Sequence, residues 1–315
     1  MNAGEDMVAT RSARAAGAWT DEGGLKFSGH ESFVIRYGWL PKLYDAVTAS
    51  ADVFSSDERA ILTLGLGRNM VKSIRFWGDA LGLTEQAGRQ VVTTGLAKRL
   101  LDPATGRDPY LEDVDSLWRL HWLLTTRARL GAWSTFFLDM RDAIVPRQRL
   151  VTAVTGCAEA AGSRISPNTA GAHVDILVRS YDAGRSDGVT VPEDALGCPL
   201  QELDLVREES VLGTPTLRLS RGPKPTLGIP AFAFAVHDFW TGTSPGSSAV
   251  SLRSLMLSRR SPGMVFALDE AGLHERLDAL CAAARGLELR DDGAGGVDLV
   301  ATRRGSVDAL EELAW

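Results

Sequence analysis

One pattern, repeated three times, constrains the fold of this chain most: two helices joined by a tight turn, followed by a pair of short strands. The first copy covers residues 55–83, where Ser56 or Asp57 can cap a helix and Gly65 and Gly67 end it. The next helix has apolar residues every three or four positions, which buries one face; they are Val71, Ile74, Trp77 and Leu81. This copy predicts a helix-turn-helix.

The opposite face of this second helix is basic. Arg68, Lys72 and Arg75 recur at intervals of four and three and so project from one side, with Asn69 at the helix start. A basic helix after a glycine turn is typical of a recognition helix in the DNA major groove, whereas a solvated surface helix is the alternative. We predict that these four residues and Lys42 bind DNA.

The sequence signals are weaker for the strands of the first copy and for the second copy. Residues 90–101 can supply the hairpin of a winged helix, although Gly95 and Ala97 also permit a short helix. The second copy has a helix over 151–157 and another that Ser166 and Pro167 cap. After a polar insert at 182–192, the segments 203–207 and 216–220 alternate as two strands.

The third copy is visible near the C-terminus. Residues 262–268 precede a helix from Asp269 to Leu280, and the strands 287–290 and 297–301 flank a glycine-rich turn. The three copies together predict a mainly α fold with small β-hairpins, built from tandem winged helix-turn-helix-like units. A plain α+β domain with such hairpins is the alternative.

The copies also suggest where the chain divides. Residues 1–24 lack periodicity and are expected to form a disordered leader. We expect an N-terminal helical domain with a winged-helix-like unit over 25–146, a second unit over 147–245 and a C-terminal unit over 246–315.

Composition limits the class of protein. The chain is 44% hydrophobic and 23% charged, as folded domains are, and no apolar run is long enough for a membrane span or a signal peptide. We therefore expect a cytoplasmic protein without a membrane partner. The three cysteines, Cys157, Cys198 and Cys281, form no C-x-x-C pair, so we expect free thiols. A net charge of -6 excludes a histone-like coat but not a local basic surface.

The densest polar cluster in an apolar segment is His30, Glu31 and Arg36. At a scissile phosphodiester, His30 could act as general base or metal ligand, Glu31 as a ligand and Arg36 as a phosphate clamp. The structural alternative is that His30 and Glu31 satisfy buried polar groups and fix a turn while Arg36 forms an ion pair. No H-E-x-x-H, P-loop, dinucleotide fingerprint or nuclease core of the D-E-x-K type accompanies them. We predict these three residues as catalytic.

Other polar residues fit structural roles better. His121 lies in an apolar helix and His237-Asp238 precedes Phe239, so these side chains are expected in the core or an interface. Four acids near a predicted helix start could hold magnesium through oxygen ligands, but a capped, solvated helix start explains them more readily; they are Asp108, Glu112, Asp113 and Asp115.

Four segments resemble a bacterial family once catalogued as a domain of unknown function, the SspB-type nickases associated with DNA phosphorothioation. They are KFSGHESFVIRYGWLPK (26–42), LGRNMVKSIRFW (66–77), DPYLED (108–113) and LWRLHWLL (117–124). With the region around Leu203 and residues 232–240, they span most of 26–240, whereas residues 241–315 rest on pattern alone.

The resemblance implies a role in anti-phage defence. A family member would nick one DNA strand, with Mg²⁺ or Mn²⁺ as the expected cofactor, so that sulfur can enter the backbone. Its expected partners are double-stranded DNA, a cysteine desulfurase, an ATP-dependent sulfur-transfer enzyme and an ATPase. A non-catalytic DNA-binding adaptor that positions the sulfur-transfer enzymes is the alternative, and a helical scaffold that binds proteins is a third hypothesis.

Overall fold

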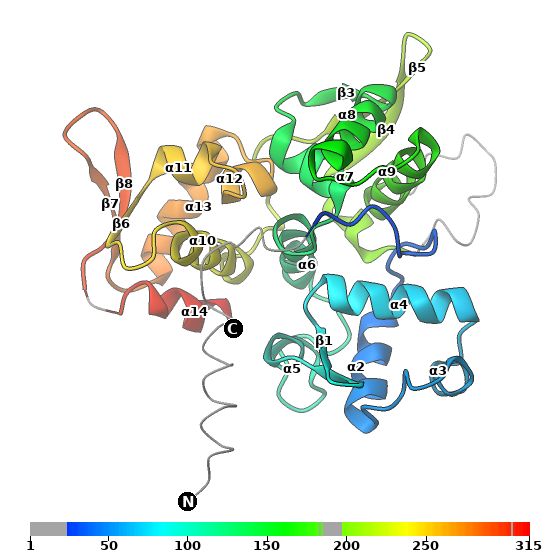
Figure 1. The fold of residues 1–315 in the computed structure, drawn as a ribbon. Helices are drawn as coiled ribbons and strands as arrows, with labels where there is room; N and C mark the ends of the chain where they lie inside the picture. The colour runs from blue at the N-terminus through cyan, green and yellow to red at the C-terminus, as the bar shows by residue number, and fades with distance from the viewer. Residues whose placement is uncertain (1–23, 183, 185–196, 304) are drawn as a thin grey trace, which may run out of the picture.

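The computed structural model describes residues 24–182, 184, 197–303 and 305–315, and this part of the chain is mostly helical with small antiparallel sheets (Figure 1). The expected mainly α fold with hairpins is confirmed at this level. Nearly all of the predicted leader, and most of the insert predicted at 182–192, lie outside the described residues.

The N-terminal part contains three helices and a hairpin before a short fourth helix. Its elements are α2 (Trp39–Ala49), α3 (Asp57–Leu64), α4 (Arg68–Ala80), β1 (Thr84–Ala87), β2 (Gln90–Thr93) and α5 (Gly95–Leu101). Ser56 caps α3 by accepting a hydrogen bond from the Arg59 amide (3.2 Å), and Gly65 ends it with a φ of 63°. The predicted helix–turn–helix is therefore present. Of the hairpin predicted within 90–101, only β2 lies there, because its partner β1 precedes the segment; the alternative, a short helix, is present as α5.

A buried helix, α6 (Val114–Thr126), occupies the centre of the molecule (Figure 1). Every residue from Asp115 to Thr126 is buried, as expected for a helix surrounded on all sides. The short α7 (Gly131–Trp133) and a π-helix (Ser134–Asp139) follow it. Because α6 packs against α10 (Ile229–Thr243), α12 (Pro262–Val265) and the 3₁₀ helix at 199–203, it joins the second and third copies.

The second copy begins with a short strand. Its elements are β3 (Ile144–Pro146), α8 (Arg147–Ala160), α9 (Pro167–Tyr181), the 3₁₀ helix (Pro199–Leu203), β4 (Val206–Val211) and β5 (Thr214–Leu219), with strand order β3-β5-β4. Ser166 caps α9 as predicted. β4 begins three residues later than predicted, because residues 199–203 form a 3₁₀ helix. Both strands extend further toward their turn than predicted, because Leu212 and Gly213 alone make it, with φ of 51° and 79°. β3 lies before the expected boundary at 147 but pairs with β5.

The third copy has the same strand order, β6-β8-β7. Its elements are α10 (Ile229–Thr243), β6 (Ala249–Ser251), α11 (Leu252–Leu257), α12 (Pro262–Val265), α13 (Glu270–Ala283), β7 (Leu287–Asp291), β8 (Val297–Ala301) and α14 (Asp308–Ala314). Asp269 caps α13 by accepting from the Gly272 amide (2.8 Å). The C-terminal α14 packs on α10. The helix and hairpin predicted here from pattern alone are both present.

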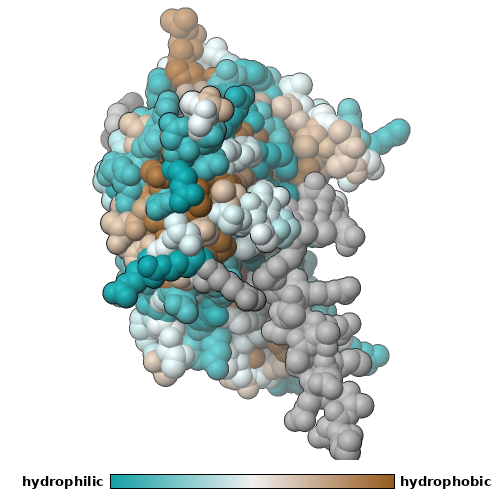
Figure 2. Space-filling model, turned by 90° about the vertical axis from the view of Figure 1, so that its left-hand side faces the viewer, coloured by the Kyte–Doolittle hydropathy of each residue, from teal (hydrophilic) through white to brown (hydrophobic). Residues whose placement is uncertain are grey.

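The surface mixes hydrophilic and hydrophobic residues, and the hairpin of β4 and β5 projects at the top (Figures 1 and 2). The projecting turn exposes Val211 and Leu212. Within the described ranges, no helix has the length and apolar character that crossing a membrane requires. The three cysteines have free thiols, as expected.

Candidate nucleic-acid interface

Helix α4 separates an apolar face from a basic one, as its sequence predicted. Val71, Ile74 and Trp77 are buried, whereas its exposed residues include Arg68, Asn69, Lys72 and Arg75. The apolar side anchors the helix, because the indole Nε1 of Trp77 donates a hydrogen bond to the Phe33 carbonyl (3.1 Å). The four residues predicted to bind DNA therefore share one solvent-facing side of a well-anchored helix.

The cations of this face are only partly neutralised. Arg68 lies 3.3 Å from the Asp57 carboxylate, but Arg75 donates to the neutral amide of Gln86 (3.3 Å). In the described ranges no carboxylate forms an ion pair with Lys72. Lys42 contributes at the turn before α4, where its ammonium donates to the Leu64 carbonyl at the end of α3 (3.1 Å).

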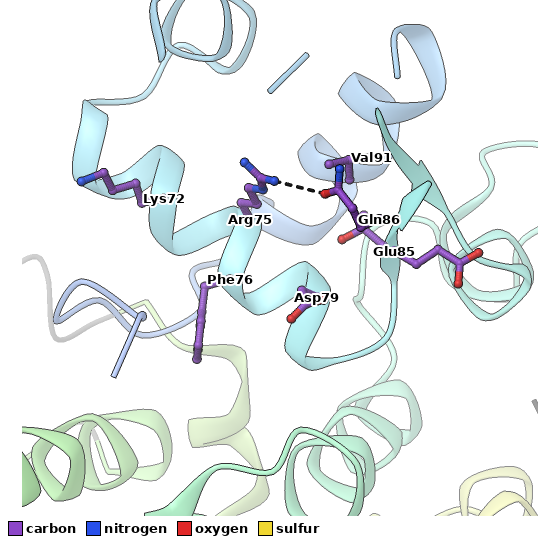
Figure 3. Close-up of a pocket in the computed structure, with 8 residues that line it drawn as sticks. Lys72, Arg75, Phe76, Asp79, Glu85, Gln86 and Val91 are labelled. Atoms are coloured by element: carbon purple, nitrogen blue, oxygen red, sulfur yellow. Dashed lines mark hydrogen bonds between the residues drawn. The ribbon is translucent and has the colours of Figure 1, made fainter. Parts of the chain in front are cut away.

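A groove of about 350 Å³ runs between α4 and the hairpin of β1 and β2 (Figure 3). Arg75 reaches across it toward Gln86, and Lys72 points out from the next turn of α4 (Figure 3). Asp79, at the C-terminal end of the groove, is held by Lys26 (2.7 Å). The groove therefore has a basic N-terminal half, an acid that Lys26 pairs (Asp79), and a second acid, Glu85, on the hairpin side.

A loop of unusual backbone lies against α4. Gly29, Glu31 and Ser32 have φ of 106°, 48° and 63°, a region that non-glycine residues rarely enter. A Cβ on Gly29 would lie 2.8 Å from the Phe76 ring of α4, so the loop needs glycine here for space as well as for conformation. Strained backbone of this kind is typical of functional sites and persists only where the surroundings hold it.

His30 joins this loop to both α4 and α9. Its ring stacks on His173 of α9 (centroids 5.3 Å apart) and on Trp77 of α4 (6.4 Å). Arg179 of α9 donates to the Ser32 carbonyl (2.9 Å). The loop is thus fixed between the second helices of the first two copies.

Burial first, and then the charge of Arg179, lower the pKa of His30 to about 4, so the ring is neutral at pH 7. Its Nδ1 accepts a hydrogen bond from the Ser32 amide (3.2 Å). In the neutral ring Nε2 therefore carries the hydrogen and donates to Nδ1 of His173 (3.1 Å). His30 is 5% exposed. These contacts fit a residue that positions the loop.

The other two residues of the predicted catalytic cluster point elsewhere. Glu31 is exposed, and the Arg36 guanidinium lies over the Phe33 and Trp39 rings, 5.5 and 5.7 Å from their centroids. Of the three residues, Glu31 is the most exposed, Arg36 is half-buried and His30 is buried.

The structure also brings in His173 and Arg179, which the sequence analysis did not single out. Both lie in α9, 143 residues from His30 and 147 from Ser32. The sequence placed His173 on the apolar side of a predicted helix, but this pattern does not show that His30 is its partner.

Two residues that were expected to be structural, His121 and Asp238, are structural in this fold, and the third, His237, is half-buried. His121 is fully buried, with its Nδ1 2.7 Å from the Tyr181 hydroxyl and its Nε2 2.7 Å from the Val265 carbonyl. The Asp238 carboxylate accepts from Trp122 Nε1 (2.8 Å) and pairs with Arg127.

The acids before α6 also serve the backbone. Asp108 accepts from the amides of Glu112 and Asp113 (3.0 Å each), and Asp113 caps the helix by accepting from the Asp115 amide (2.9 Å). In the described part of the chain, no three histidine, cysteine or acidic side chains are grouped to hold a metal ion.

Comparison with known proteins places this architecture among relatives. A family model described as "Protein of unknown function (DUF4007)" matches residues 27–313. The magnesium-bound SspB crystal structure superposes with a TM-score of 0.80 at 28% identity, covering 90% of this chain and 86% of that chain. A second SspB crystal structure gives 0.79 at 27% identity, covering 90% and 85%. No curated protein sequence matches the chain.

Proposed function

Because the chain belongs to the DUF4007 family and has an SspB-like structure, we propose that it is the DNA-acting component of a phosphorothioation system of the Ssp type. In this proposal it binds duplex DNA and nicks one strand so that sulfur can enter the backbone. The observation that carries the proposal is the partly unneutralised basic face of α4, beside a strained loop, in a chain that is SspB-like along nine-tenths of its length.

The geometry of the first copy supports DNA binding. In our proposal, its helix pair and hairpin act as a winged helix-turn-helix-like unit whose second helix enters the major groove. In the other two copies a third strand pairs with the hairpin, β3 with β5 and β6 with β8. In the first copy one hydrogen bond takes the place of this pairing, from the Val91 amide to the Ala51 carbonyl (3.2 Å). In our proposal α4 is the recognition helix, Lys72, Arg75 and Arg68 bind phosphates or guanine edges, and Lys42 binds the backbone near the turn.

The nicking step is assigned to the loop at residues 29–32. Glu31 is its exposed carboxylate, and the loop that carries it packs against α4 at Gly29 and Phe76. We assign catalysis to Glu31, a positioning role to His30, and orientation of a phosphate to Arg36 through its fixed guanidinium plane.

Magnesium is the expected ion because one SspB structure contains it. Mg²⁺ commonly uses one or two protein carboxylates together with water and substrate phosphates. The described residues do not fit a cage made by the protein alone, since they contain no cluster of three metal-ligating side chains. The proposal therefore gives no residue of this chain a metal-dependent step.

The alternative function, a DNA-binding adaptor for the sulfur-transfer enzymes, keeps the α4 assignment and removes catalysis. The burial of His30 favours this alternative, because it leaves Glu31 as the one exposed acid-base side chain among the three residues predicted to be catalytic. A desulfurase, a sulfur-transfer enzyme and an ATPase remain the proposed partners in both cases.

Plasmid relaxation separates the two functions. With Mg²⁺ or Mn²⁺, the nickase converts supercoiled plasmid to open circles without linear product, because one site cuts one strand. Glu31→Gln should lower the rate by about 10²-fold, the usual scale for loss of an acid-base group, and leave DNA affinity unchanged. Glu159→Gln, an exposed acid of α8, is the matched control and should nick normally. Equal rates for both variants would remove Glu31 from catalysis, and an inactive parent that still binds DNA would favour the adaptor.

A further inference from the structure

Two arginines lie together where the second and third copies meet. Arg221, just after β5, donates to the main-chain carbonyl of Arg141, just after the π-helix (3.3 Å). Arg141 in turn donates to the Leu257 carbonyl at the end of α11 (3.3 Å) and contacts the sulfur of Met264. Both side chains are exposed. Partial burial, and then the charge of Arg141, lower the pKa of Arg221.

This pair differs from its arginine neighbours. Arg218, Arg149 and Arg259 each have a carboxylate within 3 Å, at 2.6, 2.6 and 2.9 Å. Within the described ranges, the guanidinium groups of Arg141 and Arg221 bind only neutral protein atoms and no carboxylate pairs with either.

A third cation adds to the local charge. Lys224 is 7% exposed, and its ammonium donates to the carbonyls of Ser220 (2.7 Å) and Gly222 (3.3 Å). Burial lowers its pKa most, Asp269 opposes that shift, and Arg221 lowers it further. Arg221 therefore lies near the charges of both Arg141 and the buried Lys224 ammonium, in a chain whose net charge is -6.

Like charges held together destabilise the site unless an anion neutralises them, and a low local dielectric increases that cost. Guanidinium groups match the oxygens of a phosphate in geometry and lose less hydration than an ammonium does. One nitrogen of each guanidinium group donates a hydrogen bond to a main-chain carbonyl, which holds the group in place. Its other N–H groups can then donate to a ligand.

We propose that Arg141 and Arg221 form a second phosphate-binding site, at the junction of the second and third copies and separate from α4. Phosphate oxygens are its ligand chemistry, and a backbone phosphate of DNA is the source that we favour. The choice of DNA as the source of the phosphate rests on the proposed function, whereas the inference that the two arginines bind phosphate oxygens does not. Bound DNA would thus contact the chain at α4 and at this junction.

The test uses a double variant, Arg141→Gln with Arg221→Gln, which removes both charges but keeps donors for the carbonyls. We expect the salt slope of duplex binding, the change in log K per log of salt, to fall by roughly 2, or about one per lost phosphate contact. Arg141→Lys with Arg221→Lys should retain most of the slope. Arg218→Ala, an ion-paired arginine of the adjacent strand, is the control and should bind as the parent does.

A second arm uses pyrophosphate as a free-phosphate probe, with stabilisation measured by thermal unfolding. A smaller DNA slope in the Gln double variant supports the backbone source. An unchanged slope with loss of pyrophosphate stabilisation would overturn that source and leave a free-phosphate site. Unchanged behaviour in both arms would overturn the proposal. A parent that binds pyrophosphate through this pair but binds no DNA would instead contradict the proposed function alone.

Discussion

Gly29→Ala tests whether the loop depends on glycine for the two reasons that the structure gives. The residue has a φ of 106°, and an added Cβ would meet the Phe76 ring at 2.8 and 2.9 Å. A side chain in a left-handed backbone costs about 1–2 kcal/mol, and an overpacked contact about 1–3 kcal/mol. The free energy of unfolding should therefore fall by roughly 2–5 kcal/mol.

Gly38→Ala is the matched control, because Gly38 also has positive φ (73°) but open space around its Cβ position. Its cost should stay near the conformational part, about 1–2 kcal/mol. Urea unfolding of both variants measures the difference. Phe76→Leu in the Gly29→Ala background should recover part of the loss, since a double-mutant cycle isolates the contact between neighbours. Equal costs for the two glycine variants, with no coupling to Phe76, would refute the close approach that fixes this loop.

Two further predictions concern the core. Burial lowers the pKa of His121 to about 4, below its unfolded value near 6.5; the unfolded chain therefore binds a proton first as pH falls, and stability is lost from about pH 6.5 down to 4. Between pH 7 and 5 the parent should lose about 2 kcal/mol that His121→Asn does not lose, and parallel pH profiles in urea unfolding would contradict this. The second concerns Arg119, whose guanidinium lies 4.3 Å from the Trp315 ring centroid and donates to the Ala314 carbonyl (2.6 Å). Trp315→Ala should destabilise the chain by on the order of 2 kcal/mol and Trp315→Phe by less, and a Trp315→Ala variant as stable as the parent would exclude this C-terminal anchor.

Local signals in the sequence predicted the elements well. Ser56, Ser166 and Asp269 act as helix caps, and the spacing of Val71, Ile74 and Trp77 identified the buried side of α4. Capping and periodicity are properties of a few adjacent residues, so one sequence is enough to find them. The short strands β3 and β6 escaped the analysis because three residues carry no period.

The candidate site depends on contacts between residues that lie far apart in the sequence, and such contacts could not be predicted from it. His30 looked like a reactive group beside Glu31, and only the fold shows that His173 and Trp77 enclose it. The basic face of α4 was predictable because its residues share one helix. The pairing of Arg141 with Arg221 was not, since 80 residues separate them.

The salt dependence of duplex DNA binding tests the central claim most directly. Arg68→Ala, Lys72→Ala and Arg75→Ala together should weaken binding across sequences and lower the salt slope by roughly 3, about one for each lost phosphate contact. Arg207→Ala, an exposed arginine 2.7 Å from Asp204, is the control and should bind as the parent does. The account predicts a folded triple variant with much reduced affinity at low salt. An unchanged affinity and an unchanged slope in that variant would contradict the assignment of α4 as the DNA-binding helix.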